Sequence, residues 1–216
     1  MSDIASIYAS IKKDINLRLA EFALLWEEGG DAEIFKELCF CVCTPQNDAR
    51  KAWNAVLGLQ EDGLLEKGGH PEIADALRSR GVRFHKNKAA YIVKNRKIFY
   101  PDTKNKIEAF IGTFIKNGDF IEARDALQKE VSGWGLKEAS HFLRNVGKGG
   151  SLCILDRHIM RQLALYRVIK EIPASINGAV YHEIEQKMLA FAKKEAVPPD
   201  ALDLVFWYKE KNELFK

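Results

Sequence analysis

The sequence of 216 residues lacks any run of about 18 apolar residues, which is the length that a membrane-spanning helix needs. Its first residues, 1–4, also lack the basic region and apolar stretch of a secretory signal peptide. Hydrophobic residues make up 47% of the chain and charged residues 29%, as in ordinary folded proteins rather than disordered ones. We therefore expect a folded intracellular protein without a membrane segment.

Cysteine is scarce, and its spacing argues against a metal centre. No C-x2-C pair occurs, so neither a zinc site nor an iron–sulfur cluster is expected. Cys39, Cys41 and Cys43 alternate within an apolar helical segment, where such residues point in different directions and cannot converge on one ion. With Cys153, they are better explained as small buried thiols in a reducing compartment.

An excess of one charge is also missing, because 33 basic residues nearly balance 30 acidic ones and the net charge is +3. The distribution is more informative, since basic and aromatic residues concentrate between positions 78 and 106. Two interpretations stay open: a face that follows a phosphate backbone, or a solvated lysine-rich helix surface. The basic residues there are Arg78, Arg80, Arg83, Lys86, Lys88, Lys94, Arg96, Lys97, Lys104 and Lys106.

Apolar residues recur at helical spacing through most of the chain, as in the stripe Ile7, Ile11, Ile15 and Leu19. No alternating pattern typical of a strand competes with these stripes. The sequence thus predicts an all-α protein that forms a single unit over residues 1–216. We expect two helical lobes with a boundary near 121–130, N- and C-terminal helices that pack together, and a cleft between the lobes.

Residues 121–147 predict two helices joined by a tight turn. The first helix covers 121–131, the turn is Ser132-Gly133-Trp134-Gly135, and the second helix covers 136–146. Glycine allows backbone angles that other residues avoid, so the peptide N–H groups of residues 133–135 can approach a phosphate closely. An ordinary turn between antiparallel helices is the competing interpretation.

Lys137 and Asp156 strengthen the functional interpretation of this hairpin. Lys137 lies in the first turn of the second helix, where the helix dipole disfavours the ammonium form that an amine nucleophile must lose. Asp156, 19 positions later, precedes another helix and is a suitable N-cap. A carboxylate held there could also stabilise positive charge on a sugar carbon. The alternatives are a surface lysine and a pure helix cap.

The segment from Gly133 to Gly147, followed by Leu155-Asp156-Arg157-His158-Ile159, resembles the signature of the helix-hairpin-helix DNA glycosylases. It is most similar to the type-2 8-oxoguanine DNA glycosylase/AP lyases of archaea and some bacteria. The resemblance implies two α-helical lobes flanking a DNA-binding cleft, with Lys137 as the Schiff-base nucleophile and Asp156 as the essential carboxylate. It implies a monomer that acts on double-stranded DNA containing an oxidised guanine, in the cytoplasm of a prokaryote and associated with the nucleoid.

The same resemblance implies that no cofactor and no metal are needed, although a hairpin carbonyl could hold a monovalent cation. Two alternatives stay open. The chain could be a glycosylase for another oxidised or alkylated base, or a helix-hairpin-helix protein that binds DNA without catalysis.

Further residues are expected at the DNA interface by their position. Gln46 and Asn47 follow an apolar helix, where related enzymes insert a polar side chain beside the orphaned base, and His158 follows Asp156. A simple capped turn at 44–48 is the alternative. Trp207 in the last predicted helix could stack on an extruded purine, although core packing is the default for such a residue. Lys216 is expected to reach the base pocket, against the alternative of a frayed chain end.

Overall fold

The structure is a computed structural model that describes residues 3–100, 106–115, 120–150 and 152–216. Within these ranges every regular element is a helix and no β-strand is present, which confirms the predicted all-α class. The helices are α1 (Asp3–Glu28), α2 (Gly30–Cys43), α3 (Ala49–Glu61), α4 (Leu64–Lys67), α5 (His70–Ser79), α6 (His85–Phe99), α7 (Lys106–Ile115), α8 (Phe120–Glu130), α9 (Leu136–Asn145), α10 (Arg157–Leu165), α11 (Gly178–Glu195) and α12 (Pro199–Lys211).

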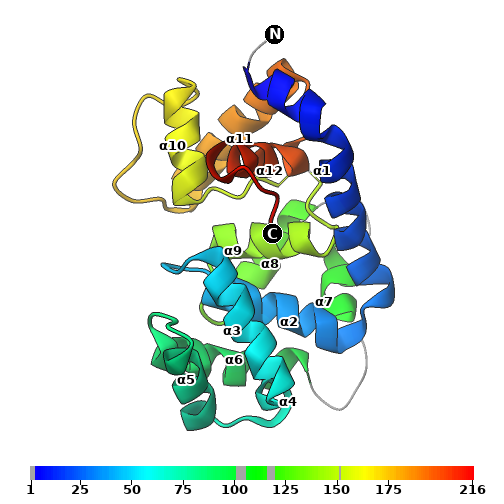
Figure 1. The fold of residues 1–216 in the computed structure, drawn as a ribbon, viewed down its shortest axis with the longest axis vertical. Helices are drawn as coiled ribbons and strands as arrows, with labels where there is room; N and C mark the ends of the chain where they lie inside the picture. Colours follow the sequence, from blue (N-terminus) through cyan, green and yellow to red (C-terminus); the bar gives the residue numbers. More distant parts are fainter. Residues whose placement is uncertain (1–2, 101–105, 116–119, 151) are drawn as a thin grey trace.

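Two hydrophobic cores divide the protein into the halves seen in Figure 1. The larger core is built from α2 to α9, and the smaller core from the first half of α1 together with α10, α11 and α12. The change from one core to the other falls between Leu152 and Cys153, later than the boundary near 121–130 that the sequence suggested. The reason is that α8 buries Ala123 and Leu127 in the larger core.

The helices at the two ends of the chain lie together. The apolar stripe of α1 buries Ile11 and Ile15 in the smaller core, where α12 contributes Leu202. The last turns of α1 reach the other half, since Leu25 and Trp26 pack against the larger core. The long helix α1 therefore runs beside both halves and connects them.

A buried ion pair crosses between the two halves. Arg124 of α8 is 0% exposed and donates two hydrogen bonds to the carboxylate of Glu185 of α11, at 2.7 and 2.8 Å. Glu185 also accepts the backbone N–H of Cys153 at 3.0 Å, and His182 lies 3.2 Å from the Arg124 guanidinium. A charge buried in this way is stable only while its partners remain in place.

The four cysteines are buried and form no disulfide, as the apolar helical segment predicted. Burial raises the pKa of the Cys43 thiol to about 12, so these thiols stay protonated. None of the helices in the described ranges has the length and apolar character that crossing a membrane requires.

The ion pair leads to a prediction about stability. Arg124→Met leaves the Glu185 carboxylate buried without its cation, so the free energy of unfolding should fall by roughly 3–5 kcal/mol. Lys187→Met is the matched control, because it breaks the exposed Lys187–Glu183 pair of the same helix and should change stability little. Urea unfolding of both variants measures the difference, and equal losses would contradict the special role of the buried pair.

Candidate active site

The hairpin between α8 and α9 is held against α6. Gly133 has φ +88°, in the left-handed region, and a Cβ at this position would lie 2.4 Å from Cδ2 of Tyr91. Both the backbone angle and the close approach therefore require glycine. Trp134 is 7% exposed and its ring packs 5.2 Å from that of Phe142, so its side chain belongs to the core.

The hairpin amides are less available to a phosphate than the sequence suggested. The N–H of Ser132 donates to Asn95 Oδ1 at 2.8 Å, and that of Trp134 to the Val131 carbonyl at 3.3 Å. The N–H of Gly135 donates to the Glu138 carboxylate at 3.1 Å. Because these amides already have acceptors, the N–H groups that remain for an anion are that of Gly133 and those of the first turn of α9, which have no acceptor within the helix.

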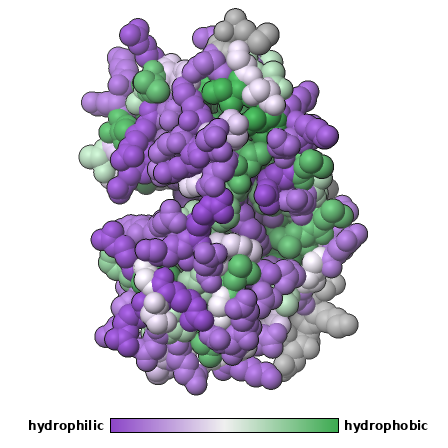
Figure 2. Space-filling model, viewed as in Figure 1, coloured by the Kyte–Doolittle hydropathy of each residue, from purple (hydrophilic) through white to green (hydrophobic). Residues whose placement is uncertain are grey.

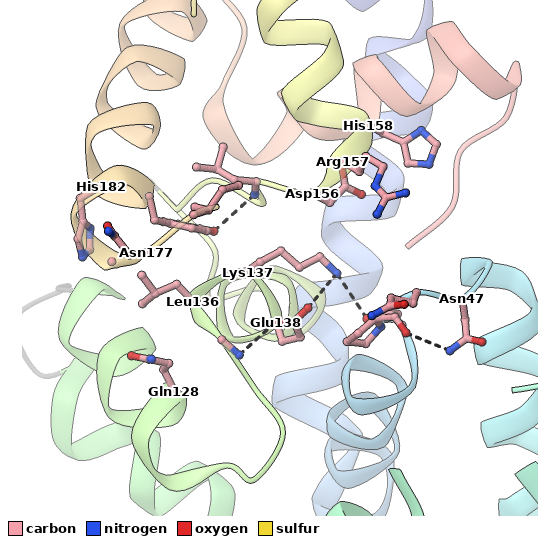
Figure 3. Close-up of a pocket in the computed structure, with 18 of the residues that line it drawn as sticks. Asn47, Gln128, Leu136, Lys137, Glu138, Asp156, Arg157, His158, Asn177 and His182 are labelled. Atoms are coloured by element: carbon pink, nitrogen blue, oxygen red, sulfur yellow. Dashed lines mark hydrogen bonds and ion pairs between the residues drawn. The ribbon is translucent and has the colours of Figure 1, made fainter. Parts of the chain in front are cut away.

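Lys137 projects from the first turn of α9, as predicted, and points into the space between the two halves. Its Nζ lies 3.4 Å from Thr44 Oγ1 and 3.6 Å from Glu138 Oε1, and its side chain is 19% exposed. Figure 3 shows this ammonium between the Asp156 side chain and the loop that carries Asn47. The amine is thus sheltered but reachable.

Asp156 is the N-cap of α10, and its Oδ1 accepts the N–H of Ile159 at 2.8 Å. The segment before it, 152–155, is buried and belongs to no helix or strand, and side chains of α11 hold it in place. Tyr181 donates its hydroxyl to the Cys153 carbonyl at 2.6 Å, and Glu185 accepts the N–H of the same residue. These contacts fix the direction of the segment and so the position of the Asp156 carboxylate.

Two cavities share Lys137 and Asp156 in their walls. The larger, of about 960 Å³, is the cleft between the two halves, whose mouth Figure 2 shows as a hollow between the upper and lower parts. The smaller, of about 140 Å³, lies deeper, and α9, α10 and α12 and Lys216 surround it. The structure therefore brings the predicted nucleophile and carboxylate to one place from separate helices.

The loop after α2 presents Gln46 to the larger cavity. Gln46 is exposed and has φ +58°, which few residues other than glycine adopt. The side chain of Asn47 is engaged differently, because its Nδ2 donates to the Cys43 carbonyl at 2.8 Å and its Oδ1 accepts the Arg83 N–H at 2.8 Å. Gln46 is thus available for a ligand, whereas Asn47 holds the loop.

Lys88 supports this loop from below. Its Nζ donates to the Cys43 and Pro45 carbonyls, both at 2.8 Å. Burial lowers the pKa of Lys88 to about 8. Arg96 likewise serves the interior, since it donates to three carbonyls of the segment 64–68. These two members of the basic segment are structural rather than part of a phosphate-binding face, and Lys104 lies outside the described residues.

Phe84 belongs to the basic and aromatic segment 78–106, which left a phosphate-binding face and a solvated surface as open alternatives. This aromatic side chain is 52% exposed at the N-cap of α6, and its backbone has φ +58°. It neighbours Arg83, which lines the larger cavity and is tied to the Gln46 loop through Asn47. The sequence shows an aromatic residue beside a basic one, whereas the exposure of its ring next to a residue that lines the cavity depends on tertiary structure.

Comparison with known proteins agrees with the geometry. The sequence model of a family described as 8-oxoguanine DNA glycosylase matches residues 15–197. The chain belongs to this family. A relative from Fusobacterium nucleatum subsp. nucleatum, named 8-oxoguanine DNA glycosylase/AP lyase, is 39% identical over 215 residues, which cover 100% of this chain and 97% of the relative. The family resemblance inferred from the hairpin, Lys137 and Asp156 is thereby confirmed.

Solved structures of two family members have the same fold. The 8-oxoguanine DNA glycosylase of Thermotoga maritima has a TM-score of 0.87 and 31% identity, over 99% of this chain and 97% of that one. The Methanocaldococcus jannaschii glycosylase/lyase, in complex with a 15mer DNA containing 8-oxoguanine, has a TM-score of 0.87 and 30% identity over both complete chains. The arrangement of the two halves is therefore that of the family.

Three residues that the sequence predicted to contact DNA or the base also line the smaller cavity, and they are Trp207, His158 and Lys216. Trp207 is half-buried in its wall, with its ring 5.8 Å from that of His158 and 6.5 Å from that of Phe215. His158 Nδ1 lies 2.9 Å from both carboxylate oxygens of Glu210. It is thus already paired, although it still lines both cavities.

Lys216 is not frayed. Its ammonium pairs with the buried carboxylate of Glu37 and lies 3.6 Å from the ring centroid of Trp53. Burial lowers the pKa of Lys216, and Glu37 opposes that change. The chain after α12 descends towards α9 in Figure 1 and closes one side of the smaller cavity. Among the described residues, no cluster of three or more His, Cys, Asp or Glu side chains is arranged to hold a metal ion.

The hairpin geometry predicts the effect of adding one methyl group. Gly133→Ala should lower the free energy of unfolding by about 2 kcal/mol or more, because alanine strains at positive φ and its Cβ meets Tyr91. Gly112→Ala in α7 is the control, since no atom lies within 4 Å of a Cβ there and alanine favours a helix. Thermal unfolding of both variants decides, and a Gly133 variant as stable as the control would contradict the geometry.

Proposed function

We infer that this protein removes 8-oxoguanine from DNA and cleaves the resulting abasic site through a lysine Schiff base. The observation that supports this most directly is that Lys137 and Asp156 line one cavity beside the hairpin. The named relatives are 8-oxoguanine DNA glycosylase/AP lyases, and one solved relative holds DNA with this lesion.

The larger cavity is where we place the duplex. The Gly133 N–H and the first-turn amides of α9 bind a phosphate, and Arg83 adds a positive charge at the opposite wall. Gln46 enters the space beside the orphaned base, and the exposed ring of Phe84 stacks on a neighbouring base. His158 lines the entrance to the smaller cavity. One chain contains all of these groups, so we propose that a monomer acts on double-stranded DNA.

The extruded base enters the smaller cavity, where Trp207 offers an aromatic face and Lys216 closes the wall. The unprotonated Lys137 amine then attacks C1′ of the sugar, and the bond from C1′ to the base breaks. The electron pair of this bond leaves with the base, which takes up a proton. The sugar ring opens to an imine on Lys137.

Strand cleavage follows from the imine. The imine acidifies the C2′ proton, and loss of that proton expels the 3′ phosphate by β-elimination. One oxygen of Asp156 accepts the N–H of Ile159 as the helix cap, and the other faces the sugar and stabilises the positive charge that develops there. The cap and the catalytic role are therefore compatible.

These steps need no cofactor. A monovalent cation at the hairpin carbonyls stays a prediction; the Ser132 carbonyl already accepts the side-chain amide of Asn95 at 3.1 Å. Because chromosomal DNA is the proposed substrate and named relatives include bacteria and archaea, we place the protein in the prokaryotic cytoplasm, at the nucleoid.

Removing the nucleophile is the first test. Lys137→Gln should reduce both base release and strand cleavage by several orders of magnitude, while binding to lesion DNA persists because the amides of the hairpin are unchanged. Single-turnover rates, an affinity titration and borohydride trapping measure the three properties. Lys187→Gln, on the exposed face of α11, is the control and should match the unchanged protein.

The same assay separates the alternatives. A DNA-binding protein without catalysis would give no borohydride-stable adduct on any duplex. A glycosylase for another base would form the adduct, but a panel of single lesions would show faster release of an oxidised pyrimidine or alkylated purine than of 8-oxoguanine.

Removing the charge of Asp156 is the second test. Asp156→Asn keeps an oxygen that accepts the Ile159 N–H, so the free energy of unfolding should fall by only about 1 kcal/mol or less. Base excision should fall far more, about a hundredfold or more, because the developing positive charge loses its counterion. Asp48→Asn, at the N-cap of α3, is the matched control for stability. Normal turnover by the Asp156 variant would leave this residue a cap and nothing more.

A further inference from the structure

His141 is a buried imidazole that the proposed chemistry has not used. It lies one helical turn after Lys137 in α9 and lines the smaller cavity with Lys137 and Trp207. Its exposed fraction is 6%, and neither ring nitrogen forms a hydrogen bond with any residue that the structure describes. The indole Nε1 of Trp207 is buried and unpartnered as well. Two side chains with buried, unsatisfied polar atoms therefore line one cavity.

Such groups destabilise a folded protein unless a partner arrives. A buried donor or acceptor without a hydrogen bond carries the full penalty of its lost hydration, and native proteins contain few of them. The ring of Phe40 contacts His141 edge-on at 5.5 Å and offers no hydrogen bond. The cavity of about 140 Å³ is close to the ~150 Å³ engineered cavity that admits benzene, so it has room for one ring of a base.

The surroundings keep His141 neutral. Its pKa lies well below the ordinary value, first because the ring is buried and then because Lys137, Arg144 and Lys216 are positively charged. The backbone of Lys216 opposes this shift but does not reach either ring nitrogen with hydrogen-bond geometry. A neutral imidazole has one N–H donor and one acceptor nitrogen.

The acceptor nitrogen is the unusual feature of this cavity. Lysine and arginine side chains only donate, and the carboxylate of Asp203 is paired with Arg144 at 2.8 Å. One oxygen of Asp156 accepts the N–H of Ile159 and the other faces the sugar in the proposed mechanism, and Thr44 accepts from Lys137. On this wall, as far as the structure describes it, His141 therefore supplies a neutral acceptor without a prior partner.

We propose that His141 hydrogen-bonds the extruded base and selects 8-oxoguanine over guanine, its acceptor nitrogen receiving the N7–H that only the oxidised base has. This inference rests on the proposed function. Guanine has a lone pair at N7, so it would place two acceptors face to face and leave the imidazole unpaired. Selection then occurs before the sugar reacts.

The test compares two substitutions on two substrates. His141→Phe keeps an aromatic ring but no hydrogen-bonding atom, and His141→Gln keeps one donor and one acceptor. Each is assayed under single-turnover conditions on a duplex with 8-oxoguanine and on one with a preformed abasic site, which has no base to recognise. Thermal unfolding reports whether each variant is folded.

His141→Phe should slow release of 8-oxoguanine about tenfold or more, yet keep cleavage of the abasic site within about twofold of the unchanged protein. His141→Gln should recover a large part of the base-release rate. An equal loss on both substrates would mean that His141 only supports Lys137, and unchanged base release would mean that it does not contact the base. Either result overturns the inference.

If His141→Phe does not fold, His141→Gln still tests the inference. A folded Gln variant that loses activity equally on the 8-oxoguanine duplex and on the abasic duplex would contradict base recognition. Failure of the proposed function has a different signature. In that case the unchanged protein would itself release no 8-oxoguanine, whatever residue stands at position 141.

Discussion

The buried carboxylate of Glu185 is the contact on which the site depends. It accepts two hydrogen bonds from Arg124 of α8 and one from the N–H of Cys153, three residues before Asp156. The hairpin half and the segment that ends in the α10 cap are thereby tied to one helix, α11. The Arg124–Glu185 ion pair is buried, so it requires one specific arrangement of its hydrogen-bonding partners. Apolar packing alone does not impose such a requirement.

The charges around the smaller cavity are paired as well. Lys137, Arg144 and Lys216 line the smaller cavity, and each is paired with a carboxylate, that of Glu138, Asp203 and Glu37 in turn. Burial raises the pKa of Asp203 to about 6 in spite of Arg144, because the side chain is withdrawn from solvent. Hydrogen bonds made there by a base are correspondingly strong, since water competes little.

The helices and the hairpin could be predicted from sequence because they depend on local spacing. The stripe of α1, the turn at Gly133 and the cap at Asp156 are all readable from residues within a few positions of one another. Their positions at helix starts already suggested an amine nucleophile at Lys137 and a charge-stabilising carboxylate at Asp156, and the family resemblance made these roles specific to a Schiff base on DNA. The lobe boundary was harder, since α8 could have packed on either core.

What could not be predicted was which polar groups are already occupied. Glu138 accepts the N–H of Gly135. The side chains of Lys88 and Asn47 donate to backbone carbonyls of the loop that carries Gln46, and Arg96 donates to three carbonyls of the segment 64–68. In sequence the Gly135 amide, Asn47, Lys88 and Arg96 looked available to DNA. Each of these contacts involves a backbone atom, which any residue carries, so no residue pattern marks them.

The continuity of α1 has a mechanical consequence. At 26 residues and about 1.5 Å per residue, it is a continuous helix of roughly 39 Å that contributes side chains to both cores. Such a helix resists any hinge-like change in the angle between the halves. In the proposed mechanism, the distortion that accompanies base extrusion then falls on the duplex, and the stiffness of the DNA at the lesion becomes part of what the protein recognises.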